Sequence, residues 1–202
     1  MDTASAPSDR KGTRRWTLAA AAGFLAGGLV VFVALQVFSR AARTRGQRIS
    51  HGEWWLEGSF SLAYLVRNTI MNLTTQAAQV ACFRKVAAHL EPGGRFVVEV
   101  MVPALQRLPP GDIFHVFRAE KDYWGIDEYD VVNQGLVSHH LEAIDGQVEC
   151  FSVPFRFVWP SELDLMAELA GMGLRKRWSG WKREPFTSAS AEHVSVWKKP
   201  ET

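Results

Sequence analysis

From about residue 60 onward, the apolar positions switch between strand-like runs and helix-like spacing. Residues 60–66 form a short apolar run with the length of a strand that is buried on both faces. Thr74 or Thr75 can cap the following helix, in which apolar residues recur every three or four positions up to Leu90. Residues 96–102 are a second apolar strand. A strand, a helix and a strand joined by short turns predict a right-handed parallel crossover.

The junction between this helix and the second strand carries the residues Pro92, Gly93 and Gly94. Proline cannot continue a helix, and glycines admit the positive φ that closes one. The sequence therefore predicts a turn at these residues, with the strand beginning only at Phe96. A junction of this kind belongs to an α/β sheet.

After residue 102 the pattern changes to short extended segments. Residues 113–119, 129–142 and 147–159 have strand-like composition, and Asp145-Gly146 is a strong hairpin signal. These segments predict an antiparallel β insertion at about 104–158.

The last part of the chain returns to helix and strand. Pro160 favours a helix start, and Gly171 or Gly173 favours its end. Two strands, 174–181 and 193–197, are then predicted to close the domain.

The first 57 residues differ from the rest. Residues 1–15 are small, polar and basic, which predicts a disordered tail. Residues 16–38 carry no charge and are long enough to cross a bilayer as a hydrophobic helix, although a signal peptide or a misplaced reading frame would also produce such a stretch. Residues 39–57 are interpreted as a linker. We expect a single-pass membrane protein with a cytoplasmic domain, or a cytoplasmic protein if 16–38 is not an anchor.

The charge balance and the cysteines limit the classes of partner. With 23 basic and 21 acidic residues the net charge is +2, which argues against nucleic-acid binding driven by bulk charge. Cys82 and Cys150 have no metal-ligand spacing around them. Buried free thiols in a reducing compartment are expected, and no metal is assigned.

Several motifs over residues 58–200 resemble the C-terminal half of a class I S-adenosylmethionine-dependent methyltransferase, of the small-molecule type with an antiparallel lid insertion. The motifs are FSLAYLVRNTIMNL, QVACFRKVAAHLEPGGRFVVEV, PFRFVWPSELDLMAELAGM and HVSVWKK. The resemblance implies a partial Rossmann-like α/β sheet with a β insertion, S-adenosylmethionine as cofactor and a small-molecule acceptor.

The same resemblance raises the question of whether this chain is active. In that family a glycine-rich loop after the first strand holds the methionine end of the cofactor, and no Gly-x-Gly-x-Gly follows a strand upstream of Phe60. We therefore expect an impaired methyltransferase. The alternative is a membrane-anchored, non-catalytic interaction module or truncated remnant. A half sheet also predicts oligomerisation through its open side, and 16–38 predicts membrane contact.

The resemblance and the residue chemistry give three groups of candidate site residues. Family likeness puts Val66, Arg67 and Asn68 beside the cofactor, while Asn68 has the alternative of satisfying backbone groups in a turn.

The other two groups lie in or beside the insertion. His139 and His140 are candidates for a general base above the acceptor, the alternative being a surface histidine pair. Arg156 and Trp159 are candidates for a substrate pocket, although Arg156 has the alternative of pairing with Glu162.

Overall fold

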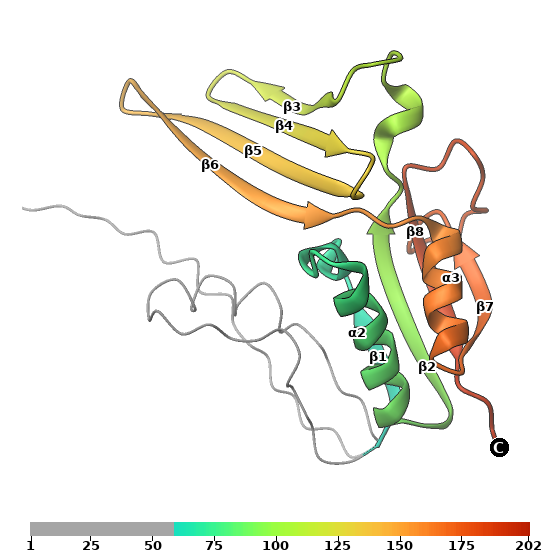
Figure 1. Ribbon diagram of the computed structural model, residues 1–202. Coiled ribbons are helices and arrows are strands. Elements are labelled where there is room, and N and C mark those ends of the chain that lie inside the picture. The colour runs from blue at the N-terminus through green and yellow to red at the C-terminus, as the bar shows by residue number, and fades with distance from the viewer. Residues whose placement is uncertain (1–58) are drawn as a thin grey trace, which may run out of the picture.

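The computed structural model describes residues 59–202, which form two four-stranded sheets of order β1-β2-β8-β7 and β3-β4-β5-β6. Figure 1 shows the second sheet reaching out beyond the first, with the helices α2 and α3 beside the first sheet. The elements are β1 (Phe60–Leu65), η1 (Thr69–Asn72), α2 (Gln76–His89), β2 (Leu90–Met101), η2 (Ala104–Arg107), β3 (Phe114–Glu120), β4 (Tyr123–Asp130), β5 (Gly135–Ile144), β6 (Gln147–Arg156), α3 (Pro160–Leu169), β7 (Gly173–Trp178) and β8 (Glu192–Lys198).

The predictions for 1–57, namely the tail, the hydrophobic helix 16–38 and the linker, lie outside the described residues. Within 59–202, the helices are too short or too polar to cross a bilayer.

The first sheet confirms the predicted α/β crossover. β1 runs parallel to β2, and α2 connects them. β8 lies antiparallel to both β2 and β7. Between the helices and the sheet, Phe83 of α2 packs edge-on against Phe96 of β2 and Trp197 of β8, with ring centroids 5.0 and 5.4 Å away. This aromatic group fixes the helices on one face of the sheet.

Local chemistry explains where the two helices begin. The Thr75 hydroxyl accepts a hydrogen bond from the Ala78 backbone N–H at 3.1 Å, so the predicted N-cap of α2 is confirmed. Pro160 occupies the first turn of α3, and Gly171 follows the helix with φ +74°, as predicted.

The prediction that the first strand is buried on both faces is wrong. Ala63 and Leu65 are buried beneath the helices, whereas Phe60, Leu62 and Tyr64 on the other face are partly exposed. The reason is that β1 is an edge strand among the described residues, pairing only with β2, and that the described helices cover one face of this sheet.

The prediction that the second strand begins after the Pro-Gly-Gly turn also needs correction. Leu90 already pairs with Phe60, and an irregularity in the pairing follows before the regular ladder begins. Gly93 has the expected positive φ, +79°. Gly94 is required for another reason, because a Cβ there would lie 2.9 Å from the Glu91 carbonyl oxygen and 3.1 Å from that of Phe60. The turn is therefore a kink inside a long strand.

In the insertion, the single strand predicted at 129–142 is wrong. β4 ends at Asp130 and β5 begins at Gly135, with a turn between them. The prediction of one strand depends on Val131 and Val132, because β-branched apolar residues favour a strand. In the structure both lie in this turn and are 61% and 86% exposed. The Asp130 carboxylate stabilises it by accepting hydrogen bonds from the backbone N–H groups of Val132 and Asn133.

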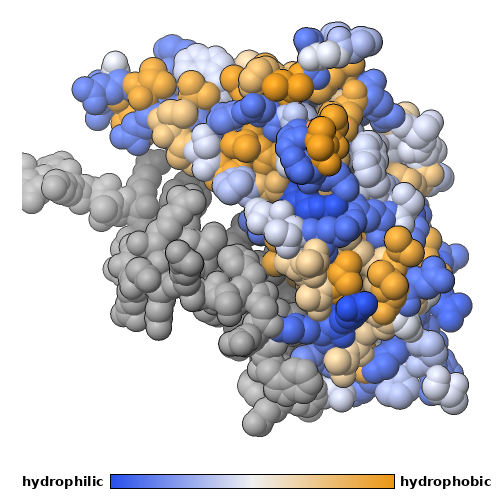
Figure 2. All heavy atoms as spheres, in the orientation of Figure 1, coloured by the Kyte–Doolittle hydropathy of each residue, from blue (hydrophilic) through white to orange (hydrophobic). Residues whose placement is uncertain are grey.

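The second hairpin follows the prediction. β5 and β6 pair in an unbroken antiparallel register, and both residues of the Asp145-Gly146 turn have positive φ, +51° and +78°. Figure 2 shows apolar and polar side chains interleaved over this sheet, at the top of the view.

Candidate functional site

The candidate site lies on the inner face of the second sheet, which meets the carboxyl ends of β1 and β2 at Tyr129 and extends outward along β4 to Tyr123. The Tyr129 hydroxyl on β4 accepts a hydrogen bond from the Ala104 backbone N–H, just after β2, at 3.3 Å. The Tyr129 ring also packs against Phe157, with ring centroids 5.6 Å apart. These contacts identify the face of β4 that turns toward the first sheet. In α/β sheets, ligands bind outside the carboxyl ends of the parallel strands.

Arg67 and Asn68 shape the carboxyl end of β1. Both have positive φ, 55° and 60°. The Arg67 backbone N–H donates to the Glu99 carboxylate at 2.9 Å, and the Asn68 side-chain oxygen accepts from the Met101 backbone N–H at 2.7 Å. The Asn68 oxygen thus joins the ends of the two parallel strands. It satisfies a backbone N–H group, which is the alternative to a role beside the cofactor.

Val66 adds to the same bend. Its carbonyl oxygen accepts a hydrogen bond from the Thr69 backbone N–H at 3.2 Å and another from the Thr69 hydroxyl. The three residues predicted beside the cofactor therefore form one tight bend at the edge of the sheet where ligands bind.

The inner face of the second sheet carries a polar group that we call the Asp127 cluster: Asp127, Ser138, His140 and Tyr123. Asp127 of β4 lies directly opposite Ser138 of β5. The Ser138 hydroxyl bonds to the Asp127 carboxylate and lies 3.3 Å from His140 Nε2. The Tyr123 hydroxyl contacts His140 Nδ1. These side chains form a continuous hydrogen-bonded chain from the carboxylate to the phenol.

Two aromatic rings flank His140 in the outer part of this cluster. The His140 imidazole stacks on Phe151 with 4.6 Å between ring centroids and 7° between planes. Phe117 of β3 approaches the same imidazole edge-on at 5.8 Å and lies over Gly125, where a Cβ would meet the ring at 2.2 Å. Glycine at 125 therefore makes room for an aromatic wall.

Burial changes the proton affinities in the cluster. Asp127 is 6% exposed, and its burial raises the pKa of the carboxyl group, although the Ser138 hydrogen bond and the nearby histidines oppose this. Burial also lowers the pKa of His140, against the opposing effect of Asp127 and with a further lowering by His139. The His140 imidazole is therefore neutral at neutral pH and able to accept a proton.

The hydrogen-bond chain determines the tautomer of His140. An ionised Asp127 only accepts, so the Ser138 hydroxyl must donate to it and can in turn accept from Nε2–H. Nδ1 then carries the lone pair and accepts from the Tyr123 hydroxyl. Charge on Asp127 thus increases the basicity of His140 toward Tyr123.

The two predicted histidines lie on opposite faces of β5. His139 points away from the cluster, with Nδ1 2.8 Å from the Ser152 hydroxyl and Nε2 3.1 Å from the Glu128 carboxylate. Only His140 belongs to the inner face. The structure therefore separates a pair that the sequence presents together.

Arg156 lies in the interior between the two sheets. It donates to the Glu162 carboxylate at 2.7 Å, to the Gln79 side-chain oxygen at 2.5 Å and to Gln134 at 2.7 Å. All of these contacts are internal to the protein. They include the ion pair with Glu162, which is the alternative to a role of Arg156 in a substrate pocket. Trp159 is the residue before α3, and its ring lies edge-on to Phe157 with centroids 6.2 Å apart.

Sequence reasoning missed Asp127 and Tyr123. Both lie in β4, whereas the sequence pattern predicts no strand over residues 120–128. The available signal was the two-residue spacing of Ser138 and His140, since alternate residues of a strand share one face. His115 of β3, opposite Asp127, was also missed; its Nδ1 is buried without a hydrogen-bond partner in the part of the chain described. Over the same residues, 59–202, His, Cys, Asp and Glu side chains form no group of three that suits a metal ion. Both cysteines are free; Cys82 is buried as expected, but the expectation is wrong for Cys150, which is exposed on β6.

Comparisons with known proteins show which proteins this chain resembles. No family model matches the sequence. The cypemycin N-terminal methyltransferase of a Streptomyces species is 24% identical over 143 residues, which are 69% of this chain and 58% of that protein. The chain thus spans somewhat more than half the length of this curated relative.

Solved structures give a stronger likeness. The CcbJ methyltransferase from Streptomyces caelestis matches with a TM-score of 0.66 and 34% identity, over 74% of this chain and 65% of that one. An S-adenosylmethionine-dependent methyltransferase from Clostridium acetobutylicum matches at 0.61 and 10% identity, over 84% and 74%. CalS10, an amino pentose methyltransferase from Micromonospora echinaspora, matches at 0.52 and 19% identity, over 82% and 72%. Together with the mixed sheet and its antiparallel insertion, these likenesses show that the chain has the fold of the class I S-adenosylmethionine-dependent methyltransferases.

Proposed function

We propose that the protein takes part in methyl transfer from S-adenosylmethionine to an amine of a small molecule. The names of two similar proteins, an N-terminal methyltransferase and an amino pentose methyltransferase, support an amine acceptor. The observation that carries the proposal is the position of the Asp127 cluster, a buried carboxylate joined to a neutral imidazole on the inner face of the insertion.

The chemistry needs little from the protein besides alignment and removal of a proton. The cofactor, when bound, supplies a methyl group on a sulfonium, and an acceptor nitrogen displaces the thioether in a direct substitution. As the N–C bond forms and the S–C bond breaks, the nitrogen must lose one proton.

The Asp127 cluster offers a path for that proton. The half-buried Tyr123 hydroxyl can receive it from the acceptor while passing its own proton to His140 Nδ1. Through Ser138, the carboxylate of Asp127 stabilises the imidazolium that forms. The partly exposed rings of Phe117 and Phe151 would offer apolar contacts to the acceptor beside His140.

The described residues suit the acceptor side of such a site better than the donor side. The bend at Val66, Arg67 and Asn68 lies at the correct edge of the sheet, but the Asn68 oxygen is engaged with the Met101 backbone. The sequence upstream of Phe60 also lacks the glycine-rich loop. We propose that this chain alone binds the cofactor weakly, and is in that sense impaired.

A transfer assay with labelled S-adenosylmethionine tests the function. An amino sugar and a short peptide with a free N-terminus serve as acceptors, and mass spectrometry locates the methyl group. We expect slow transfer to nitrogen, reduced about 100-fold or more by His140→Ala. The matched control is His139→Ala, on the opposite face of the same strand, which should keep the wild-type rate. Equal rates for the two variants would remove His140 from the mechanism.

Calorimetric titration with the cofactor tests the proposal of weak cofactor binding separately from the proposal of methyl transfer. Micromolar affinity would overturn the weak-binding proposal and leave methyl transfer standing. No transfer at saturating cofactor and acceptor would favour the second candidate, a non-catalytic interaction module, which the missing loop supports. The proposed membrane contact through 16–38 and the proposed homo-oligomer belong to this candidate, and detergent-free fractionation with light scattering tests both.

A further inference from the structure

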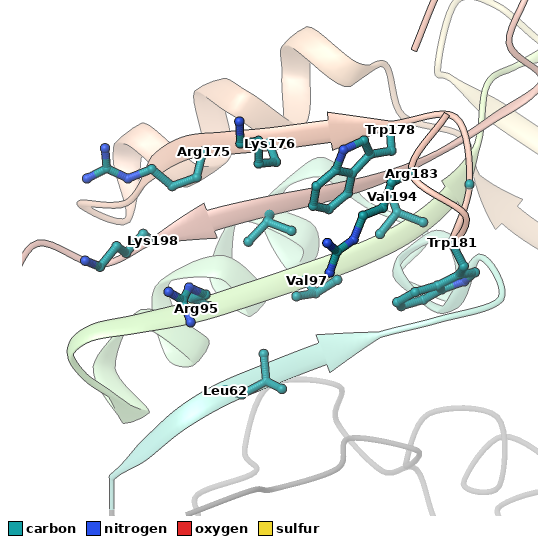
Figure 3. Close-up of a pocket in the computed structure, with 12 residues that line it drawn as sticks. Leu62, Arg95, Val97, Arg175, Lys176, Trp178, Trp181, Arg183, Val194 and Lys198 are labelled. Atoms are coloured by element: carbon teal, nitrogen blue, oxygen red, sulfur yellow. The ribbon is translucent and has the colours of Figure 1, made fainter. Parts of the chain in front are cut away.

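The face of the first sheet opposite α2 and α3 carries a groove of about 760 Å³. In Figure 3 the labelled side chains stand in front of the sheet while the helices lie behind it. The floor of the groove is apolar, formed by Leu62 of β1, Val97 of β2, and Val194 and Val196 of β8. The groove therefore runs across three neighbouring strands.

Among residues 59–202, this face has no helical layer of the kind that an α/β sheet normally has on each side. Parallel strands and the strands mixed with them are usually covered by helices on both faces, because each face presents apolar side chains. α2 and α3 supply one layer, through Phe83 for example. The apolar floor on the other face has no helix over it among residues 59–202.

The rim of the groove is strongly basic. It carries Arg95, Arg175, Lys176, Arg183 and Lys198, and no acidic residue is among the residues that line the groove. Arg95, Arg175 and Lys176 are exposed, and no described carboxylate lies within salt-bridge distance of them.

Carboxylates lie at one end of the rim, since those of Glu184 and Glu192 would be within 4 Å of a Cβ on Gly180, whereas the other end carries Arg95, Arg175 and Lys176. Lys198 pairs with the exposed Glu201. Arg183 stacks over the Trp178 ring, 5.4 Å from its centroid. Glu99, which shares this face of β2, accepts a hydrogen bond from the Arg67 backbone. An occupant that reaches the end of the groove at Arg95 and Lys176 therefore meets both an apolar floor and positive charge without a described ion-pair partner.

The positive charge of the rim disfavours two possible occupants of the groove, namely the chain's own residues 16–38 and a second copy of the protein. Between positions 10 and 48, this chain carries eight basic residues and no acidic one, so docking its own apolar run 16–38 would bring like charge to the rim. A second copy facing the first through the same groove would place two basic rims together. Both arrangements are opposed by repulsion.

We infer that the groove docks an amphipathic helix with acidic flanks that another polypeptide supplies. The apolar side of the helix would cover the floor formed by Leu62, Val97 and Val196, and its carboxylates would pair with Arg95 and Lys176. Such a helix would cover the face on which residues 59–202 place no helix. The inference is independent of methyl transfer, because the groove lies on the face opposite α2 and α3 and shares no residue with the Asp127 cluster.

The test uses the full chain and two fluorescent helical peptides of about 18 residues, or ~27 Å of helix. Both have the same leucine stripe, flanked by glutamate in one peptide and by lysine in the other. In fluorescence anisotropy we expect the glutamate peptide to bind at least about tenfold more tightly, with the difference reduced by salt. The double variant Arg95→Glu/Lys176→Glu should reverse the preference. Arg84→Glu, at an exposed position on α2, is the matched control and should leave it unchanged.

Three outcomes would overturn the inference. Equal binding of the two peptides would remove charge selection, and an unchanged preference in the double variant would place binding elsewhere. Stronger binding to vesicles of anionic lipid, lost in the double variant, would identify the groove as a membrane surface. Tighter binding of a peptide of residues 16–38 would identify the chain's own segment as the occupant.

Discussion

Arg156 of β6 and Glu162 of α3 form a nearly buried ion pair, 2.7 Å between Nη2 and Oε1, that ties the second sheet to a helix of the first. Gln79 and Gln134 complete the shell of the guanidinium. Burial alone would raise the pKa of Glu162, but hydrogen bonds from Arg156, Gln134 and Gln76 outweigh it and lower the pKa. The pair therefore joins the part of the fold that carries the Asp127 cluster to the part that carries the parallel strands.

Arg156→Met should destabilise the protein by about 4 kcal/mol, because it leaves the Glu162 carboxylate without its buried counter-charge. Urea unfolding followed by far-UV circular dichroism measures this. The control is Glu201→Gln, which breaks the exposed pair with Lys198 and should shift the midpoint very little. An Arg156→Met variant as stable as the control would mean that the pair is not a structural tie.

His193 should make stability depend on pH. Its imidazole is fully buried, with Nδ1 2.8 Å from the Ser195 hydroxyl and Nε2 without a partner among the described residues. Burial lowers the pKa of His193 to about 4, with a further lowering by Arg177 and an opposing effect of Asp164. The unfolded chain, near 6.5, takes up the proton first. The contribution is therefore fully present above pH 6.5 and is lost as the pH falls toward 4.

The loss amounts to on the order of 3 kcal/mol between these pH values. Urea unfolding at pH 7 and pH 4.5 measures it, and the Glu162 carboxyl contributes in the same direction at the lower end. His193→Gln cannot titrate and should flatten the pH dependence, whatever its effect on stability at pH 7. An unchanged slope in this variant would assign the acid sensitivity to other groups.

The sequence was sufficient where local chemistry decides the structure. Thr75 caps a helix and Asp145-Gly146 closes a hairpin because the required groups lie within a few residues of one another. It was insufficient where the answer depends on distant strands. Two-residue spacing places Ser138 and His140 on one face, yet only the pairing with β4 brings Asp127 to them. Val131 and Val132 have the composition of strand residues but are exposed in a turn. Composition alone cannot show which apolar residues stay in contact with water.

Gly94→Ala should be costly although the position lies in a predicted turn. The new Cβ would meet two backbone carbonyl oxygens, of Glu91 at 2.9 Å and of Phe60 at 3.1 Å, and neither can move without breaking the pairing of β1 and β2. We expect a loss of about 1–3 kcal/mol in thermal or urea unfolding. Gly173→Ala is the control, because nothing lies within 4 Å of the added methyl group. Equal stability of the two variants would contradict the kink inside β2.

Asn68 offers a direct test of the two roles weighed for it. If its oxygen serves to hold the Met101 N–H, Asn68→Asp keeps an acceptor at the same place and should leave stability nearly unchanged. Asn68→Gly tolerates the φ of 60° but loses the acceptor, and should cost about 1–3 kcal/mol by leaving the Met101 N–H unsatisfied. A role in binding the carboxylate of S-adenosylmethionine predicts a different ranking. Aspartate would then repel the cofactor and abolish residual transfer, while glycine would leave stability intact. Measuring unfolding and transfer on the same two variants therefore assigns Asn68 to the fold, to the cofactor, or to both.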